Sequence, residues 1–485
     1  MRRLAFRAVV LLVVLPALRA ESTKRARARA LVARYVREHA SRTDDVAARV
    51  RRDPCGARFV SADFWGKGLA NSANVALNAL ALAVVSNRTL LVSDDNRFRA
   101  GFWRYLGAVD ETWPTKKRVL EAFDAAGGCA RCGGCVDAFP EATRDFFPVN
   151  RRCLASGNCG DGVRWLLCGA AFSDDDPPFV HVRSAVTWLA PLLLENARAG
   201  PQLKERLKTL FAPGVNAWGL LYDALLAPRA GAALDAVVEP RRPEGGLFDV
   251  GVHVRHRRYQ PRERVDAHAA ACAARALAGL AKATVFLATD QPSRLGGLRK
   301  RIRAAAPDTA IDFRSLNASS VPEAERERLR KLARTDVKAV RAGRDWGELA
   351  SERWASVADF LLLSSSRVVV GTLSSSFSEL AAAVASRRDG DAPPRRDFAA
   401  APRPRRGSSE ETGRGGDSAT WLFDPIYHLE GDARTKYNWP RPEEYLRDKD
   451  ETFRCLRGDA AWPLPQYVRL RPSTARAWIR NGGCG

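Results

Sequence analysis

Residues 247–386 constrain the fold most, because short apolar runs alternate there with stretches of helical period. The predicted strands are 247–254, 284–288, 310–313 and 367–370, and the predicted helices are 265–280, a segment ending at Arg303, 346–363 and a segment that follows the Ser-rich turn at Gly371. Short apolar strands separated by helices are typical of a parallel, doubly wound α/β sheet. We therefore expect a Rossmann-like, ligand-binding domain over residues 244–386.

A second α/β unit is predicted upstream, over residues 54–243. The apolar, Ala-rich run 71–85 has the length of a buried helix, and the run 89–93 that follows it is a predicted strand. A helix that leads into a buried strand is a frequent feature of α/β proteins. The sequence thus predicts two α/β domains in one chain.

The remaining segments differ in composition from these two domains. We assign residues 1–20 to a targeting segment, 21–53 to a charged, Ala-rich stem, 387–418 to a disordered insertion and 419–485 to a C-terminal segment. The insertion consists largely of Arg, Pro, Gly and Ser, a composition that cannot bury a core. The C-terminal segment regains aromatic residues, so we expect it to pack back on the body of the protein.

The N-terminus indicates the compartment. Arg2, Arg3 and Arg7 precede an apolar run, 8–18, in the pattern of a signal peptide. The run is shorter than the roughly 20 residues of an ordinary membrane helix, and a short, uncleaved signal anchor is the alternative. We predict a protein of the secretory pathway, in the Golgi lumen, with membrane contact only through this segment if it is retained.

Cysteines and sequons agree with an oxidising lumen. The ten cysteines are an even number, as expected for disulfides, and Asn87 and Asn317 begin glycosylation sequons. Cys129, Cys132 and Cys135 form a CxxCxxC run that could hold zinc, but a second ligand pair is missing and disulfides are the preferred interpretation.

The charge balance favours anionic ligands. The chain has 78 basic and 55 acidic residues, a net charge of +23. Arg is spread along the whole chain, and its densest cluster lies in the insertion 387–418, so we expect phosphate-bearing ligands and no nucleic acid. The non-enzymatic alternative is a secreted basic module that binds anionic glycans.

Polar side chains follow three of the predicted strands, where ligands of open α/β sheets bind. The first strand ends in the sequence GVHVRH, which contains His253 and Arg255, and the second ends at Asp290. After the fourth strand, hydroxyl groups from Thr372 to Ser376 precede a helix, whose N-terminal N–H groups and dipole suit a phosphate. Together these ends predict a basic, donor-rich pocket for a diphosphate.

Four sequence segments resemble the α-1,6/α-1,2 fucosyltransferase superfamily, which includes core N-glycan, nodulation-factor and plant xyloglucan enzymes. GVHVRH (251–256), VFLATDQPS (285–293) and ADFLLLSSSRVVVGTLSSSFSELA (358–381) are similar to its three motifs and stand in the same order. Residues 66–95 are similar to the Gly-rich loop, helix and strand of its N-terminal domain.

The resemblance implies a GT-B-like fold, with two Rossmann-type domains facing across a cleft, the first on the acceptor side. It also implies inverting, metal-independent transfer of fucose from GDP-fucose to a hydroxyl of an N-glycan or polysaccharide, with no other cofactor. Arg255 would contact the diphosphate, His253 and Asp359 the guanine, and Ser375 a phosphate. The implied donor-binding set is His253, Arg255, His256, Asp290, Asp359, Thr372, Ser374 and Ser375.

Glu263 lies where the core α-1,6 enzymes place a candidate catalytic base, with Asp266 as a nearby substitute. Arg255 and Glu263 are therefore the predicted catalytic residues. The chain departs from the core enzymes at His256, where they have a second arginine, and at Arg258 and Tyr259, where they have Asp and Lys. Histidine at the first of these positions is similar to the nodulation enzymes.

Two further enzyme interpretations remain. Asp174, Asp175 and Asp176 contain the DxD pattern with which GT-A glycosyltransferases hold Mn²⁺, although two prolines follow and a solvated acidic turn is the simpler interpretation. A degenerate transferase that binds GDP-fucose without turnover is the other. We expect no metal ion in the site.

Overall fold

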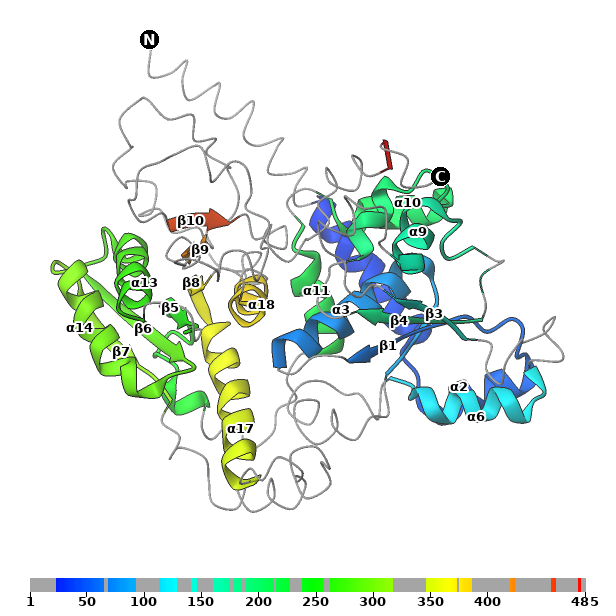
Figure 1. Cartoon of the computed structure of the whole chain (residues 1–485), viewed down its shortest axis with the longest axis horizontal. Helices are drawn as coiled ribbons and strands as arrows, with labels where there is room; N and C mark the ends of the chain where they lie inside the picture. The colour runs from blue at the N-terminus through cyan, green and yellow to red at the C-terminus, as the bar shows by residue number, and fades with distance from the viewer. Residues whose placement is uncertain are drawn as a thin grey trace, which may run out of the picture.

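The structure is a computed structural model in which two separate β-sheets organise the chain (Figure 1). It describes residues 23–64, 69–92, 113–128, 141–145, 160–173, 176, 178–184, 189–212, 215–226, 238–256, 262–316, 346–372, 375–385, 419–423, 455–458 and 479–480. The predicted segments 1–20 and 387–418, Asn317 and the CxxCxxC cysteines lie outside these residues.

The N-terminal sheet has four parallel strands in the order β2-β1-β4-β3. The strands are β1 (Phe59–Phe64), β2 (Thr89–Leu91), β3 (Glu141–Asp145) and β4 (Phe179–Ser184). Helix α3 (Leu69–Ser86) corresponds to the predicted buried helix. It is buried around its described circumference, Asn74 and Asn78 included, because it packs against β1, α10 (Pro201–Leu210), α11 (Ala217–Leu225) and the 3₁₀ turn Ala190–Glu195. The short helix α9 (Gly160–Cys168) packs against β3.

The segment assigned to a stem is part of this domain. Its described residues form one helix over 23–39 and a second, α2 (Thr43–Arg52), which packs against α6 (Lys116–Ala125). Tyr35 is buried in the first helix, where its hydroxyl donates to the Arg88 carbonyl at 2.9 Å and accepts the Leu90 N–H at 3.1 Å. The charged outer faces of these helices gave the segment its polar composition, while one apolar face of each joins the core.

The C-terminal sheet has six strands in the order β10-β9-β8-β5-β6-β7. They are β5 (Phe248–Val254), β6 (Lys282–Thr289), β7 (Ala310–Arg314), β8 (Ser366–Thr372), β9 (Ala419–Phe423) and β10 (Cys455–Gly458), and only β10 pairs in the antiparallel sense. The helices between them are α13 (Arg262–Leu277), α14 (Leu295–Ala305), α17 (Trp346–Leu363) and α18 (Ser376–Ala385). This architecture confirms the predicted α/β class with two Rossmann-type sheets.

The strand order of this sheet reverses at β5. From β5 the chain proceeds through β6 to β7 in one direction, and then returns through α17 to place β8 on the other side of β5. Such a switch point leaves a crevice at the carboxyl ends of the two central strands, because the connections leave in opposite directions. In open α/β sheets ligands bind at such a point, so the ends of β5 and β8 form the candidate site.

One hydrophobic cluster reaches both sheets. Helix α18 of the C-terminal unit packs against α3 and α11 of the N-terminal unit, and apolar side chains from both belong to one buried cluster. The Asn216 amide, which caps α11, also donates to the Ala383 carbonyl at 2.6 Å. The predicted cleft between the domains stays a prediction.

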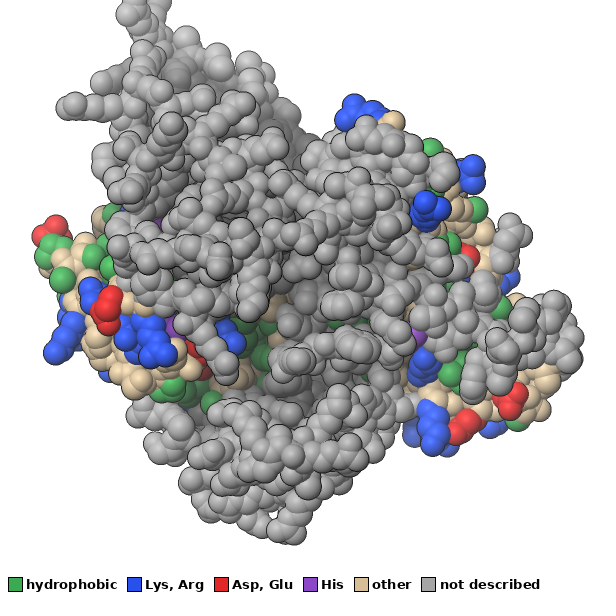
Figure 2. All heavy atoms as spheres, in the orientation of Figure 1, with side chains coloured by type: hydrophobic (Ala, Val, Ile, Leu, Met, Phe, Trp, Pro, Cys, Tyr) green, Lys and Arg blue, Asp and Glu red, His purple; other side chains and the backbone are tan. Residues whose placement is uncertain are grey.

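None of the described cysteines is free, and Cys55, Cys168 and Cys272 are disulfide-bonded. Within the described ranges we find no helix that is both long and apolar enough to cross a membrane. Lys and Arg side chains gather beside Asp and Glu side chains on the α14 side of the C-terminal unit (Figure 2).

Candidate functional site

Thr372 joins the two central strands at the switch point. It is fully buried at the end of β8, and its hydroxyl accepts the backbone N–H of Arg255 at 2.8 Å. The same hydroxyl lies 3.2 Å from the His253 carbonyl, to which it donates. The structure therefore brings together the predicted residues from the first and fourth strand ends, although 117 positions separate Arg255 from Thr372.

His253 is a buried, neutral histidine. Its Nδ1 lies 2.6 Å from the Ser378 hydroxyl, which accepts the Thr372 N–H at 3.1 Å. The hydroxyl proton is thus free to point to Nδ1, which leaves the imidazole proton on Nε2. Burial lowers the pKa of His253 to about 3. The ring stands 4.7 Å from the ring of Phe377, so the site has an aromatic wall.

Arg255 presents a charged group to solvent directly after β5. Its side chain is 53% exposed, and its Nη1 lies 3.1 Å from Oδ2 of Asp290, the predicted residue at the end of β6. One ion pair occupies only part of a guanidinium, which has five N–H donors. The remaining donors can bind an anion.

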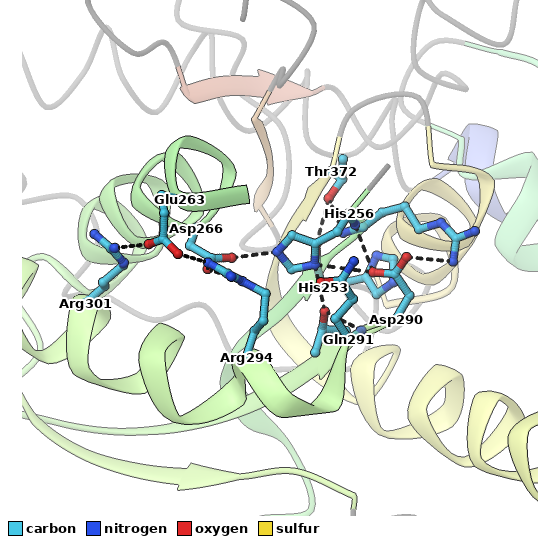
Figure 3. A network of polar contacts seen from close by, with 11 residues as sticks. His253, His256, Glu263, Asp266, Asp290, Gln291, Arg294, Arg301 and Thr372 are labelled. Atoms are coloured by element: carbon cyan, nitrogen blue, oxygen red, sulfur yellow. Dashed lines mark hydrogen bonds and ion pairs between the residues drawn. The ribbon is translucent and has the colours of Figure 1, made fainter. Parts of the chain in front are cut away.

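His256 is buried, and Figure 3 shows its ring between Asp266 and Asp290. Its Nε2 is 2.7 Å from Asp266 Oδ1, and its backbone N–H donates to Asp290 Oδ1 at 2.8 Å. Burial lowers the pKa of His256, but the hydrogen bonds to Asp266 and Asp290 raise it more, so the net pKa is raised. Because the ring is enclosed, it does not contact a ligand directly, and it can act on one only through its charge and through the residues that it contacts.

Glu263, the predicted base, lies at the start of α13, and two arginines from outside this helix bind its carboxylate. One carboxylate oxygen pairs with Arg294 Nη2 at 2.5 Å and the other with Arg301. The hydrogen bond from Arg294 is the main cause that lowers the pKa of Glu263. Asp266, the substitute, is buried and accepts Arg294 Nε at 2.8 Å. Both carboxylates are therefore engaged in ion pairs.

The N-terminus of α18 meets the end of β8. Ser375 is buried, its N–H donates to the Thr372 carbonyl at 3.1 Å, and its own carbonyl accepts the Glu379 N–H. The next N–H groups of the first turn are those that a helix leaves without intrahelical partners. Ser374 lies outside the described residues.

Asp359 is a partly buried carboxylate on α17. Its Oδ1 is shielded from solvent and has no hydrogen-bond partner among the described residues. Burial raises the pKa of Asp359 to about 8. A buried acceptor without a partner is costly unless a ligand supplies the donor. Asp359 therefore fits the predicted contact to a guanine base, which presents N–H donors.

The third aspartate of the DxD pattern has a structural role. Asp176 is buried, its Oδ1 accepts Trp165 Nε1 at 3.1 Å, and its Oδ2 accepts the Phe172 N–H at 2.6 Å. Both oxygens thus serve the fold. Asp174 and Asp175 lie outside the described residues.

Ser378 and Arg294 are site residues that the sequence motifs did not single out. Ser378 lies in the same Ser-rich string as Ser375 and Ser376, and one turn of helix carries it to His253. Arg294 had no comparable signal, because its partners come from another helix.

The exposed Asn87 of the first sequon lies at the end of α3 with a φ of 57°.

Comparison with known proteins gives the following likenesses. The family model described as "Family of unknown function (DUF7810)" matches residues 201–398. No curated protein sequence matches the chain. Among solved structures, a mutant of Arabidopsis thaliana FUT1 in complex with GDP is 13% identical, covers 68% of this chain and 69% of its own, and has a TM-score of 0.46.

Two structures of NodZ are also similar. The NodZ α-1,6-fucosyltransferase soaked with GDP-fucose is 16% identical over 68% of this chain and 93% of its own, with a TM-score of 0.36. NodZ from Bradyrhizobium is 16% identical over 67% of this chain and 92% of its own, also with a TM-score of 0.36.

Proposed function

We propose that this chain is a glycosyltransferase that moves fucose from GDP-fucose to a glycan hydroxyl, with inversion and without a metal ion. The observation that supports this best is the switch point between β5 and β8, where Arg255, neutral His253 and the start of α18 meet at the carboxyl edge of the sheet. A cation and helix N–H groups suit a diphosphate. The motif resemblance supports the choice of GDP-fucose.

The proposed reaction needs two kinds of group. An acceptor hydroxyl attacks the anomeric carbon of fucose, the bond from that carbon to the diphosphate oxygen breaks, and GDP leaves with the electron pair. Arg255 and the first turn of α18 would stabilise the charge that develops on the departing diphosphate. The proton of the acceptor hydroxyl must pass to a base.

Glu263 as that base stays a prediction. It would have to leave Arg294 and Arg301 when the donor and acceptor bind, because a carboxylate with a lowered pKa in two ion pairs is a weak base. This same observation favours a second candidate, a protein that binds GDP-fucose without turnover.

We place the protein in the lumen of the secretory pathway, in the Golgi. Disulfide-bonded Cys55, Cys168 and Cys272 and the exposed sequon residue Asn87 support this location. The acceptor would then be a glycan on a protein or a secreted polysaccharide. Membrane contact would be limited to residues 1–20, if they are retained.

The test is calorimetric titration of the purified luminal chain with GDP and with UDP in EDTA, followed by incubation with GDP-fucose and a panel of glycans. GDP selectivity together with fucosylated product supports the transferase. GDP selectivity without product on any acceptor favours the binding protein. A preference for UDP, or binding only after Mn²⁺ is added, contradicts the proposal.

A further inference from the structure

A series of six ionisable side chains runs from Glu263 at the surface to Arg255 at the switch point, and acidic and basic groups alternate along it. The order is Glu263, Arg294, Asp266, His256, Asp290 and Arg255, and every neighbouring pair is in contact (Figure 3). The residues come from α13, the turn after β6 and the end of β5, so no single motif contains them.

We propose that His256 and Asp266 are positioning residues, which hold Asp290 and through it the Arg255 guanidinium in the orientation that meets the diphosphate of the donor. The proposal rests on the proposed function for the identity of the ligand. It adds a role for two side chains that are too deeply buried to touch that ligand.

Asp290 is the link between the buried pair and Arg255. One of its oxygens accepts the backbone N–H of His256 at 2.8 Å and lies 3.4 Å from Nδ1 of the same residue. The other oxygen pairs with Arg255 at 3.1 Å. Because His256 holds one oxygen of the carboxylate, the other oxygen stays directed toward Arg255.

Asp266 fixes His256 in turn. The His256 side chain is 1% exposed and the Asp266 side chain 2% exposed, and 2.7 Å separates Nε2 from Oδ1. An imidazole has only two nitrogens, and here Asp266 occupies one while Asp290 and the Thr289 hydroxyl face the other. Buried charges persist only when they are paired, and Arg294 supplies the second cation on Asp266.

The arrangement also adds positive charge next to the donor site. The charged groups in contact with His256 are Asp266 on α13 and Asp290 after β6, and His253 on β5 interacts with it at longer range. Arg294 reaches His256 through Asp266, and Arg255 reaches it through Asp290. His253 is neutral, since burial lowers its pKa. A protonated His256 therefore offsets the two aspartates and leaves more of the Arg255 charge for an anion.

The test compares GDP affinity between variants at several pH values. We expect His256→Gln and Asp266→Asn to weaken GDP binding about tenfold at pH 7. For His256→Gln, the ratio of its dissociation constant to that of the wild type should fall toward one as the pH rises through the raised pKa of His256, because the wild type then loses the same charge. Titration of the phosphates and of Asp359 cancels in this ratio.

Two matched variants serve as controls. Asp312→Asn removes another carboxylate that pairs with an arginine, and His39→Gln replaces a partly buried histidine of the other domain. Both should bind GDP like the wild type at every pH. If folded Asp266→Asn and His256→Gln also do so, the proposal is overturned.

A measurement without GDP separates this inference from the proposed function. In the free protein, the Arg255 Nε–H resonance should be sharp in the wild type and broadened in Asp266→Asn, with no change in Asp312→Asn. If the wild type does not bind GDP, the proposed function fails. A broadened Arg255 signal in Asp266→Asn then still supports the positioning role, and an unchanged signal overturns it.

Discussion

Ser378 on α18 holds His253 on β5 through a hydrogen bond of 2.6 Å between Oγ and Nδ1. The bond fixes the imidazole beside the ring of Phe377, which in turn stands 5.7 Å from the ring of Phe360 on α17. Three elements thus meet at one aromatic wall. Such a wall can stack against a planar base while the neutral imidazole donates from Nε2.

Arg255 is the residue whose loss should affect transfer most directly. We expect Arg255→Ala to lower kcat about 10²–10³-fold, the usual effect of removing a charge-stabilising donor. The midpoint of thermal unfolding should change little, since half of the side chain is exposed. Lys300→Ala, an exposed cation on α14, is the control. Equal turnover by Arg255→Ala and the control would refute the role of Arg255.

Thr372→Val should destabilise the switch point itself. The substitution removes the acceptor of the Arg255 N–H and the donor to the His253 carbonyl, at a cost of about 1–3 kcal/mol. Thr372→Ser keeps the hydroxyl and should retain most of this stability. Urea unfolding of the two variants measures the difference. Full stability in Thr372→Val together with a loss in Thr372→Ser would show that packing of the methyl group, and not the hydroxyl, matters at this position.

Asp359 should release a proton when GDP binds. With a pKa raised to about 8, its carboxyl is mostly protonated at pH 7 in the free protein. A carboxylate that accepts guanine N–H groups must be ionised, so binding should release up to about one proton. Calorimetry in buffers of different ionisation enthalpy measures this number. Asp359→Asn should abolish the release and reduce the preference for GDP over ADP, whereas an unchanged release would exclude Asp359 as its source.

His253 and Asp359 should act on stability in opposite senses. The pKa of His253 is lowered to about 3 in the folded protein. Its contribution to the free energy of unfolding is therefore complete above the pKa of the unfolded chain, about 6.5, and is lost as the pH falls toward 3. The pKa of Asp359 is raised to about 8, so its contribution is complete below about 3.9 and is lost as the pH rises toward 8.

Between its folded and unfolded pKa values, each of these two groups changes the free energy of unfolding by up to about 1.4 kcal/mol per pH unit. Between pH 4.5 and about 6 the slopes cancel in the wild type. In that range His253→Asn should become less stable as the pH rises, and Asp359→Asn less stable as it falls. Denaturant unfolding at three pH values measures both slopes, and parallel profiles for the two variants would contradict the assignment.

Tyr35 tests whether the segment before residue 54 belongs to the folded domain. Tyr35→Phe leaves the Leu90 N–H without its buried acceptor, and we expect a loss of about 1–3 kcal/mol. A chain that begins at residue 23 should unfold like the full chain, whereas one that begins at residue 54 should lose its cooperative transition. If the shorter chain kept full stability, the segment would be a stem after all.

The alternation of strand and helix could be predicted from the sequence because apolar period is a local property. The predicted strand 247–254 and helix 346–363 differ from β5 and α17 by at most one residue at either end. The strand-end residues His253, Arg255, Asp290 and Thr372 could also be chosen, since parallel strands bring their carboxyl ends to one edge. Composition gave the wrong assignment for residues 23–52, because it averages the charged outer face of a helix with its apolar inner face.

Only the tertiary structure decided how the side chains divide their partners. Whether His256 faces the ligand or Asp266, and whether Glu263 is free or held by Arg294, depends on the packing of α13 against α14 and the turn before it. The two hydrogen bonds that organise the switch point join residues 117 and 125 positions apart. No local pattern encodes such pairs, because strand register and helix packing place them in contact only after the whole sheet has formed.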